Sequence, residues 1–274
     1  MRIVSLLLIF CGLLGSGARS LAAQEPARLL TIEVGELPFV ISAPHGGKLD
    51  LPNVPARSGE GLKDGPGGFV TSRDTGTEEL AMEVAAEIKR RYDKPVHLVV
   101  NRVHRKYCDP NRIAAEAYDS DGGKTHFDAY HTAMKAACAA TQKQFVRGLV
   151  LDLHGQGTSA ETVYRGTQNG KTVTLLRERF GAAAHTGPES LFGLLKVRGW
   201  TIHPDPLDGK EQSGFNGGPI VRTYGNPQAY GLDAIQFEFG GNYRTATARK
   251  ATAQVLVDAL VLYGKLYLNL PEPK

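Results

Sequence analysis

Two histidines stand near the ends of predicted buried strands, and their surroundings suggest a metal site. His45 comes shortly after the apolar run 39–43 and precedes two glycines, and His154 follows the largely apolar run 149–153 and precedes one glycine. Loops at the carboxyl ends of buried parallel strands form the binding crevice of an open α/β sheet. Neutral imidazole is a favoured zinc ligand, and catalytic zinc usually has three protein ligands. The pattern therefore predicts that both histidines bind Zn²⁺.

The third ligand is expected to be a carboxylate. Asp74 stands at the start of a predicted helix and is the preferred candidate, although an Asp in that place is also a common N-cap. Thr75 and Glu78 have the spacing of a capping box, which would leave Asp74 for the metal. Glu78 is the alternative ligand, and the sequence leaves the choice between the two carboxylates open.

A hydrolytic site also needs a base, and Glu238 is the candidate. It interrupts the apolar strand predicted at 232–239, where a carboxylate is costly unless it is paired, bound to metal or facing a cleft. A buried salt bridge with Arg222 or Arg244 is the structural alternative. Asp152 lies two residues before His154 and so points to the same sheet face, where it is expected to orient the imidazole.

The segment 102–112 is dense in hydrogen-bond donors. Asn111 and Arg112 offer amide and guanidinium groups that suit a substrate carboxylate, and Arg105 could polarise a scissile carbonyl. A solvated basic turn explains the same composition without any ligand. The sequence contains neither a His-Glu-x-x-His motif nor a Gly-x-Ser-x-Gly motif.

Alternating strands and helices must position these residues. Helix periodicity and apolar runs predict five strands, at 29–34, 38–43, 96–100, 149–153 and 232–239. Helices are predicted from 74–77 to about 91, and at 127–146, 190–197 and 245–266. Asn169-Gly170 predicts a hairpin over 163–175, and glycine-rich loops are expected at 46–73 and 214–225. This order predicts an α/β fold with three α/β/α layers and a mixed, mostly parallel sheet.

The N-terminus differs in composition from the rest of the chain. Arg2, the apolar run 3–14 and the small residues up to Ala23 predict a secretory signal peptide at 1–23, followed by a single domain at 24–274. The apolar run is short for a membrane span, so we expect an exported protein, periplasmic or extracellular, without stable membrane insertion after cleavage.

The net charge argues against one class of partner, and the cysteine content leaves one structural question open. Removal of Arg2 and Arg19 with the signal peptide lowers the net charge from +4 to +2, which is too balanced to predict a nucleic-acid partner. Cys108 and Cys138 remain, and the sequence leaves open whether they form a disulfide.

The ordered set of motifs resembles the N-formylglutamate amidohydrolase family, which is related in fold to the zinc carboxypeptidases. The matching segments are Pro44-His45-Gly46-Gly47, Asp74-x-x-Thr77-x-x-Leu80, Arg105-x-x-x-Asp109-x-Asn111-Arg112, Tyr130-His131, Asp152-Leu153-His154-Gly155, Gly217-Gly218-Pro219-Ile220-Val221-Arg222 and Gln236-Phe237-Glu238. Each motif is short, but together they cover most of the chain in family order.

The resemblance implies a zinc-dependent amidohydrolase with a zinc carboxypeptidase-like (phosphorylase/hydrolase-like) fold. By this likeness, zinc is held by His45, Asp74 and His154, and Glu238 is the catalytic carboxylate. Arg105 would stabilise the oxyanion, and the substrate would be bound by Asn111, Arg112 and Arg222.

Two features depart from the family. Gly46 stands where the family usually has serine, and Gly155 stands where it often has serine. The predicted export argues for a substrate other than the cytoplasmic N-formylglutamate. We therefore expect hydrolysis of an amide bond in an N-acyl amino acid, a short peptide or a cell-wall fragment with a free carboxylate.

Two other classes of function fit the same residues. An exported small-acid-binding module of the same fold would use the cleft without catalysis, and a structural zinc domain would use four protein ligands. The sequence does not define the acyl group, the amino acid recognised or the oligomeric state.

Overall fold

The computed structural model describes residues 28–65 and 68–273, and the predicted signal peptide at 1–23 lies outside them. Strands occupy β1 (Leu30–Glu33), β2 (Phe39–Ala43), β3 (His97–Asn101), β4 (Leu149–Gly155), β5 (Thr162–Gly166), β6 (Thr201–His203) and β7 (Asp233–Phe239). The longer helices are α2 (Thr77–Tyr92), α4 (Asp121–Gln144), α5 (Thr174–Phe180) and α11 (Arg249–Tyr267). Shorter helices are α3 (Ala114–Ala117), η2 (Lys171–Val173), α6 (Ala183–Thr186), α7 (Leu191–Lys196), α8 (Pro219–Tyr224), α9 (Pro227–Tyr230) and α10 (Gly241–Arg244).

The strands form one mixed sheet in the order β1-β3-β2-β4-β7-β5-β6. The four central strands, β3, β2, β4 and β7, are parallel to one another, whereas β1 and β5 each join the sheet antiparallel to a neighbour. Strands β2 and β4 are adjacent, so the loops after them open at the same edge. This arrangement brings His45 and His154 together, as the sequence predicts.

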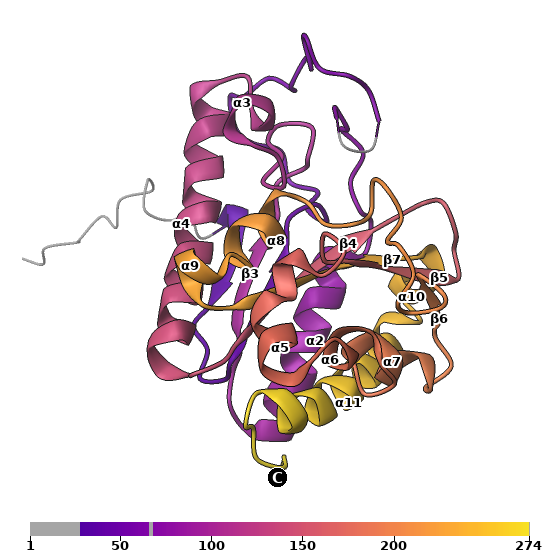
Figure 1. The fold of residues 1–274 in the computed structure, drawn as a ribbon. Helices are drawn as coiled ribbons and strands as arrows, with labels where there is room; N and C mark the ends of the chain where they lie inside the picture. Colours follow the sequence, from indigo (N-terminus) through magenta and orange to yellow (C-terminus); the bar gives the residue numbers. More distant parts are fainter. Residues whose placement is uncertain (1–27, 66–67, 274) are drawn as a thin grey trace, which may run out of the picture.

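Helices cover both faces of the sheet and give three layers (Figure 1). Alternate residues of each central strand enter different cores. Phe39 and Ile41 pack with α2, α7 and α11, whereas Val40 packs with α4 and α8. The α/β/α architecture and the mixed, mostly parallel sheet are therefore confirmed.

The predicted hairpin at 163–175 is wrong. The turn at Asn169 and Gly170 exists, with φ of 55° and 91°, but the chain then enters η2 and α5 rather than a second strand. Strand β5 pairs instead with β7 and β6, which are distant in sequence. A two-residue turn signature reports local backbone shape, and it does not identify the strand's partner.

Three other boundaries differ from the prediction. The 214–225 segment contains α8, which begins at Pro219, a residue well suited to the first helical position. Helix α4 begins at Asp121 rather than 127, and α11 begins at Arg249 rather than 245. The capping box is also absent from the start of α2, where Gly76 is the N-cap with φ of 90° and no side-chain cap.

Candidate metal centre and active site

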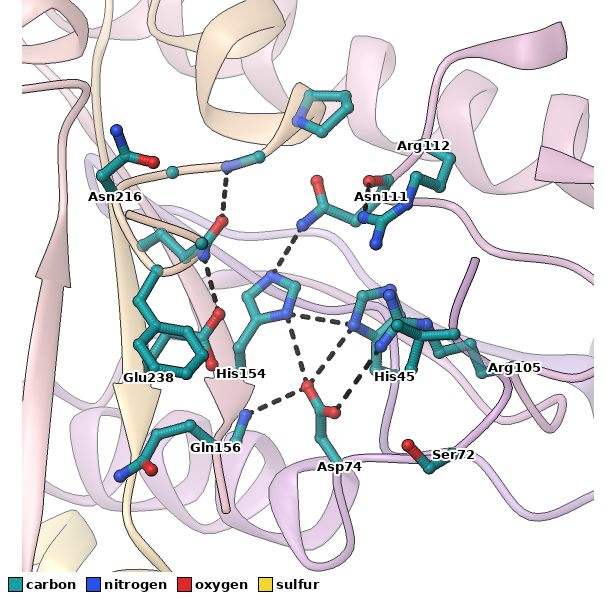
Figure 2. Close-up of a pocket in the computed structure, with 18 of the residues that line it drawn as sticks. His45, Ser72, Asp74, Arg105, Asn111, Arg112, His154, Gln156, Asn216 and Glu238 are labelled. Carbon is teal, nitrogen blue, oxygen red and sulfur yellow. Dashed lines mark hydrogen bonds and ion pairs between the residues drawn. The ribbon is translucent and has the colours of Figure 1, made fainter. Parts of the chain in front are cut away.

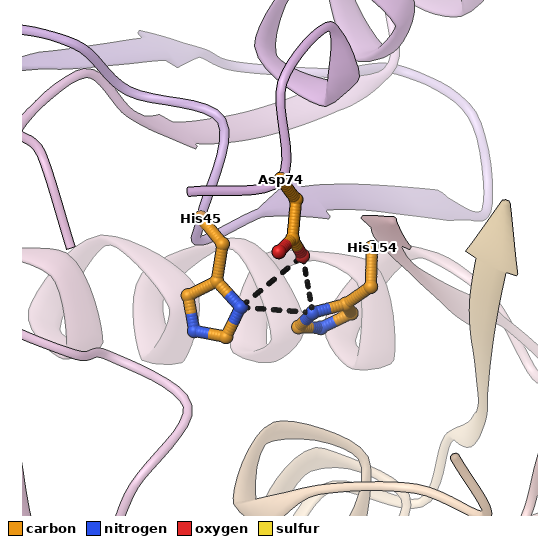
Figure 3. A group of neighbouring side chains, drawn as sticks. All are labelled: His45, Asp74 and His154. Carbon is orange, nitrogen blue, oxygen red and sulfur yellow. Dashed lines mark hydrogen bonds and ion pairs between the residues drawn. The ribbon is translucent and has the colours of Figure 1, made fainter. Parts of the chain in front are cut away.

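Three donor atoms meet at the carboxyl edge of the sheet (Figure 3). The Nδ1 atoms of His45 and His154 lie 3.1 Å apart, and each is 3.4 Å from Oδ2 of Asp74. Asp74 is held there by its backbone N–H, which donates to the carbonyl of His45, and by the N–H of Gly155, which donates to Oδ2. Of the two candidate carboxylates, Asp74 therefore joins the histidines.

These separations fit a metal ion. Ligand atoms that each lie about 2 Å from a tetrahedral ion are about 3.3 Å from one another, close to the distances found here. The alternative carboxylate, Glu78, points elsewhere and accepts a hydrogen bond from Arg102 at 3.1 Å. Within the described residues the group has three members, whereas a purely structural zinc site usually has four protein ligands.

The far nitrogen of each imidazole bonds to a buried carboxylate. Nε2 of His45 lies 2.6 Å from Oδ1 of Asp109, and Nε2 of His154 lies 2.7 Å from Oδ2 of Asp152. A carboxylate accepts, so Nε2 carries the hydrogen in both rings and both Nδ1 atoms present lone pairs. Two lone pairs facing each other at 3.1 Å repel unless a proton or a metal ion lies with them. The chemistry of the donor set thus fits a bound cation.

The electrostatics of the cluster point the same way. Burial alone would raise the pKa of Asp74, but the imidazoles of His154 and His45 outweigh it and hold that pKa well below its usual value. Burial likewise disfavours a charged His154, yet Asp152 and Asp74 raise its pKa well above the ordinary value. The site stabilises positive charge despite being buried.

Glu238 lies next to the cluster. In the parallel register of β4 and β7 it is opposite His154, and Gln236 is opposite Asp152, so all four side chains share one sheet face. Oε1 of Glu238 accepts a hydrogen bond from Gln236 at 2.8 Å. Burial raises the pKa of Glu238 to about 8, with Asp74 adding to the rise and His154 opposing it.

The salt bridge considered for Glu238 is not formed with either predicted partner. Arg244 donates to the backbone carbonyls of Thr75, Gln156 and Phe239. Arg222 donates to the carbonyl of Gly217 at 3.4 Å. Both guanidinium groups are therefore engaged by backbone oxygens, and the Glu238 carboxylate faces the cleft.

The donor-rich segment 102–112 is largely buried rather than a solvated turn. Arg105 donates to Oδ2 of Asp109 at 2.7 Å, and its Nη1 lies 4.0 Å from Oδ1 of Asp74. Burial would lower the pKa of Arg105, but Asp109 and Asp74 outweigh it and raise it. Arg105 therefore carries a firmly held positive charge beside the donor atoms.

Asn111 and Arg112 also lie at this side of the site (Figure 2). The side-chain oxygen Oδ1 of Asn111 accepts from the backbone N–H of Ile220 at 2.9 Å, which joins this segment to α8. Its amide nitrogen is 3.3 Å from Nε2 of His154, whose hydrogen goes to the closer Asp152. Arg112 donates to the carbonyls of Gly68 and Asn111.

These groups surround a pocket of about 630 Å³. All eight predicted site residues line it, and they come from six separate stretches of chain: His45, Asp74, Arg105, Asn111, Arg112, His154, Arg222 and Glu238. Both predicted glycine-rich segments contribute to its wall, through Val70 and Ser72 on one side and Phe215 and Asn216 on the other.

Sequence reasoning missed the partner of His45. Asp109 stands out in the sequence only as part of a motif, yet it is fully buried and accepts hydrogen bonds from His45, Arg105 and the backbone N–H of Asn111. Ser42 was also missed, and Tyr130 appeared only within a motif; the two side chains bond in series behind Asp152. The signs available in the sequence were a serine inside the apolar run 39–43 and an acid at 109 between Arg105 and Arg112.

Cys108 and Cys138 are both buried as free thiols, so the open question of a disulfide is answered against pairing. Burial raises the pKa of both, which keeps them protonated at neutral pH.

Neither a protein-family model nor a curated protein matches the sequence. The fold is similar to the crystal structure of N-formylglutamate amidohydrolase from Ralstonia eutropha JMP134, with 16% identity, a TM-score of 0.51 and coverage of 87% of this chain and 96% of that one. A gene product of Agrobacterium tumefaciens is similar at 14% identity and a TM-score of 0.50, covering 86% and 96%.

At such identities the likeness establishes the fold. The resemblance predicted from the ordered motifs is confirmed at that level. Among the described residues, no helix has both the length and the apolar character needed to cross a bilayer.

Proposed function

We propose that this protein is a zinc-dependent amidohydrolase that cleaves the amide bond of an N-acyl amino acid or short peptide bearing a free carboxylate. One observation carries the proposal: three donor atoms converge beside a buried carboxylate in a large polar pocket. The likeness in fold to an N-formylglutamate amidohydrolase agrees with it.

His45, Asp74 and His154 would hold the ion, since two imidazoles and a carboxylate suit zinc. A bound zinc ion supplies Lewis-acid polarisation of the scissile carbonyl. Asp109 and Asp152 keep the hydrogens of the imidazoles on Nε2 and so keep both Nδ1 atoms directed at the site.

Glu238 is assigned the proton transfers. It shares a sheet face with His154, and burial raises its pKa to about 8 when no metal ion is bound. A cation held by the neighbouring donors would favour the ionised carboxylate, which is the form that can act as a general base. It accepts a proton from the attacking water and returns that proton to the leaving nitrogen. Gln236, which donates to Oε1, fixes the orientation of the carboxylate.

Cationic side chains of the pocket would bind the negatively charged groups of the substrate. Arg105, beside Asp74, is assigned to the developing oxyanion. Arg112 and Arg222 line the pocket beyond it, and with Asn111 they are assigned to the substrate carboxylate. These guanidinium and amide groups suit the carboxylate of a small anionic molecule.

The proposal includes export, which depends on the pattern at residues 1–23. N-terminal sequencing of the protein recovered outside the cytoplasm tests it, with cleavage after Ala23 as the expected result.

The decisive experiment is amine release by the zinc-loaded protein across N-acyl amino acids and dipeptides, with and without a chelator. Glu238→Gln should lower turnover about 10²- to 10⁴-fold while zinc remains bound. Asp233→Asn is the matched control, because it removes a buried carboxylate from the other end of the same strand.

The outcomes separate the candidate functions. Chelator-sensitive release that survives in Asp233→Asn and is lost in Glu238→Gln supports the proposal. Full activity of Glu238→Gln contradicts the assignment of the base. Stoichiometric binding of a small acid by the zinc-loaded protein, with no product from any substrate, would instead identify a binding module.

A further inference from the structure

Arg244 joins three segments of the chain with one guanidinium group. It is the last residue of α10, which follows β7. Its Nε donates to the carbonyl of Phe239 at 3.0 Å, one terminal nitrogen donates to that of Gln156 at 3.0 Å, and the other donates to that of Thr75. The three carbonyls belong to the last residue of β7, the residue that follows β4 and the turn before α2.

Each of these carbonyls is close in sequence to a residue of the site. Thr75 follows Asp74, and Phe239 follows Glu238. Gln156 lies two residues after His154. The residue between them, Gly155, donates its backbone N–H to the Asp74 carboxylate (Figure 2). Gln156 and Phe239 are themselves joined by a backbone hydrogen bond of 3.0 Å. Arg244 thus fixes the backbone next to three site residues at once.

Two glycines make room for this arrangement. A Cβ at position 155 would lie 2.6 Å from the central guanidinium carbon of Arg244, so any side chain there displaces the group. A Cβ at Gly76 would lie 2.3 Å from the Arg244 carbonyl oxygen. The lack of a side chain at Gly155 is therefore what admits the guanidinium at this place.

We propose that Arg244 is a positioning residue that sets the relative placement of Asp74, His154 and Glu238. This inference rests on the proposed function. A guanidinium presents five hydrogens in a rigid plane and can bond to three fixed oxygens, whereas a lysine ammonium on a flexible stem cannot reproduce that geometry. The group acts through the backbone and does not itself touch the metal or the substrate.

A merely structural role would lower the stability of the protein and leave the site unchanged. The experiment therefore measures zinc affinity by competition with a chromophoric chelator, the visible spectrum of the cobalt-substituted protein, and the thermal midpoint of the metal-free protein. The variants are Arg244→Lys, which keeps the charge, and Gly155→Ala, which keeps the arginine and displaces it. Gly155 does not have a left-handed φ, so the alanine acts through its side chain.

Arg198→Lys is the matched control. Arg198 is half-buried and also donates to a backbone carbonyl, that of Leu194, but this bond lies at the end of α7, away from the site. Arg198→Lys therefore shows how the loss of an arginine–carbonyl hydrogen bond far from the site affects stability and zinc affinity.

Both Arg244→Lys and Gly155→Ala should lower zinc affinity about 10- to 100-fold and change the cobalt spectrum, while Arg198→Lys leaves both unchanged. Affinity within twofold of wild type in Arg244→Lys and Gly155→Ala overturns the inference, whatever happens to the thermal midpoint. Wild-type protein that binds zinc but hydrolyses no amide contradicts the proposed function and leaves the effect of Arg244 measurable. Wild-type protein that binds no divalent cation overturns both.

Discussion

In both imidazoles of the site, Nε2 bonds to a buried carboxylate and Nδ1 faces the other ring, but the two carboxylates have different surroundings. On the side of His45, Asp109 receives the ring hydrogen in the middle of a charged cluster that includes Arg105 at 2.7 Å and Arg57 at 3.9 Å. On the side of His154, the receiving carboxylate is Asp152, whose other oxygen accepts from the neutral hydroxyl of Ser42 at 2.7 Å.

The two buried carboxylates differ in the groups that stabilise their negative charge. Burial alone would raise the pKa of Asp109, but Arg105, His45 and Arg112 outweigh it and hold the pKa well below its usual value. Asp152 instead lies in the sheet beneath α4, where hydroxyl groups are its neighbours. We therefore expect the His45 side to respond mainly through stability and the His154 side mainly through the metal.

The largest effect is expected from Asp109→Asn. The substitution leaves Arg105 and the neighbouring guanidinium groups buried without their counter-charge, which typically costs about 3–5 kcal/mol of unfolding free energy. Chemical denaturation of the metal-free protein measures this, with Asp152→Asn as the comparison on the other side of the site. Equal destabilisation by the two variants would contradict the distinction between the two sides.

Asp152→Asn should act chiefly on metal binding. If the new amide oxygen keeps the Ser42 hydroxyl, the amide nitrogen faces Nε2 of His154 and donates to it. The ring hydrogen then moves to Nδ1, the atom that the metal needs. We expect about a 10- to 100-fold loss of zinc affinity, measured by competition with a chelator. Unchanged affinity would show that Asp152 does not set the tautomer.

This contrast also separates what the sequence could predict from what it could not. Asp152 was predictable because side chains two residues apart on a strand share a face, and the structure confirms that it orients His154. Asp109 was not, because it reaches His45 from a loop 64 residues away and no local periodicity connects the two. Asp74 was predictable only in part, because its position before α2 suited both a helix N-cap and a metal ligand.

The fold shows the same division. The central strands and α2 were predicted because burial imposes a pattern on their residues that can be read locally. The pairing of β5 with β7 was not, because partners in a sheet are chosen by packing across the whole domain. Likewise, Arg244 was considered as a partner for Glu238 but binds three carbonyls that only the folded chain brings together.

The pH dependence of stability sharpens the description of the His45 side. His126 is buried there, and its Nε2–H donates at 2.8 Å to Asn101, whose amide donates to the Pro44 carbonyl next to His45. Burial lowers the pKa of His126 to about 4. Between pH 6.5 and 4 the unfolded chain binds a proton at His126 that the folded protein does not, so this residue lowers stability as the pH falls.

We expect His126 to lower the unfolding free energy by about 2 kcal/mol between pH 7.5 and pH 5. His126→Gln should remove that part of the pH dependence, because glutamine can still donate to Asn101 and does not titrate. Urea denaturation of both proteins at the two pH values measures the difference, and acid effects at the metal ligands are common to both. Identical pH dependence of the two proteins would contradict a neutral, buried His126.

The smallest effect is expected from Tyr130→Phe, and it tests how far the His154 side extends. Ser42 donates its only hydrogen to Asp152, so the 2.7 Å contact between Tyr130 and Ser42 must be a hydrogen bond donated by the tyrosine. Loss of that hydroxyl should cost about 1 kcal/mol of stability. Zinc affinity should fall by less than about threefold, because the Ser42–Asp152 bond is unchanged and outer neighbours count less than the carboxylate itself. A loss as large as that of Asp152→Asn would mean that the hydroxyl groups, and not only the carboxylate, determine where His154 carries its hydrogen.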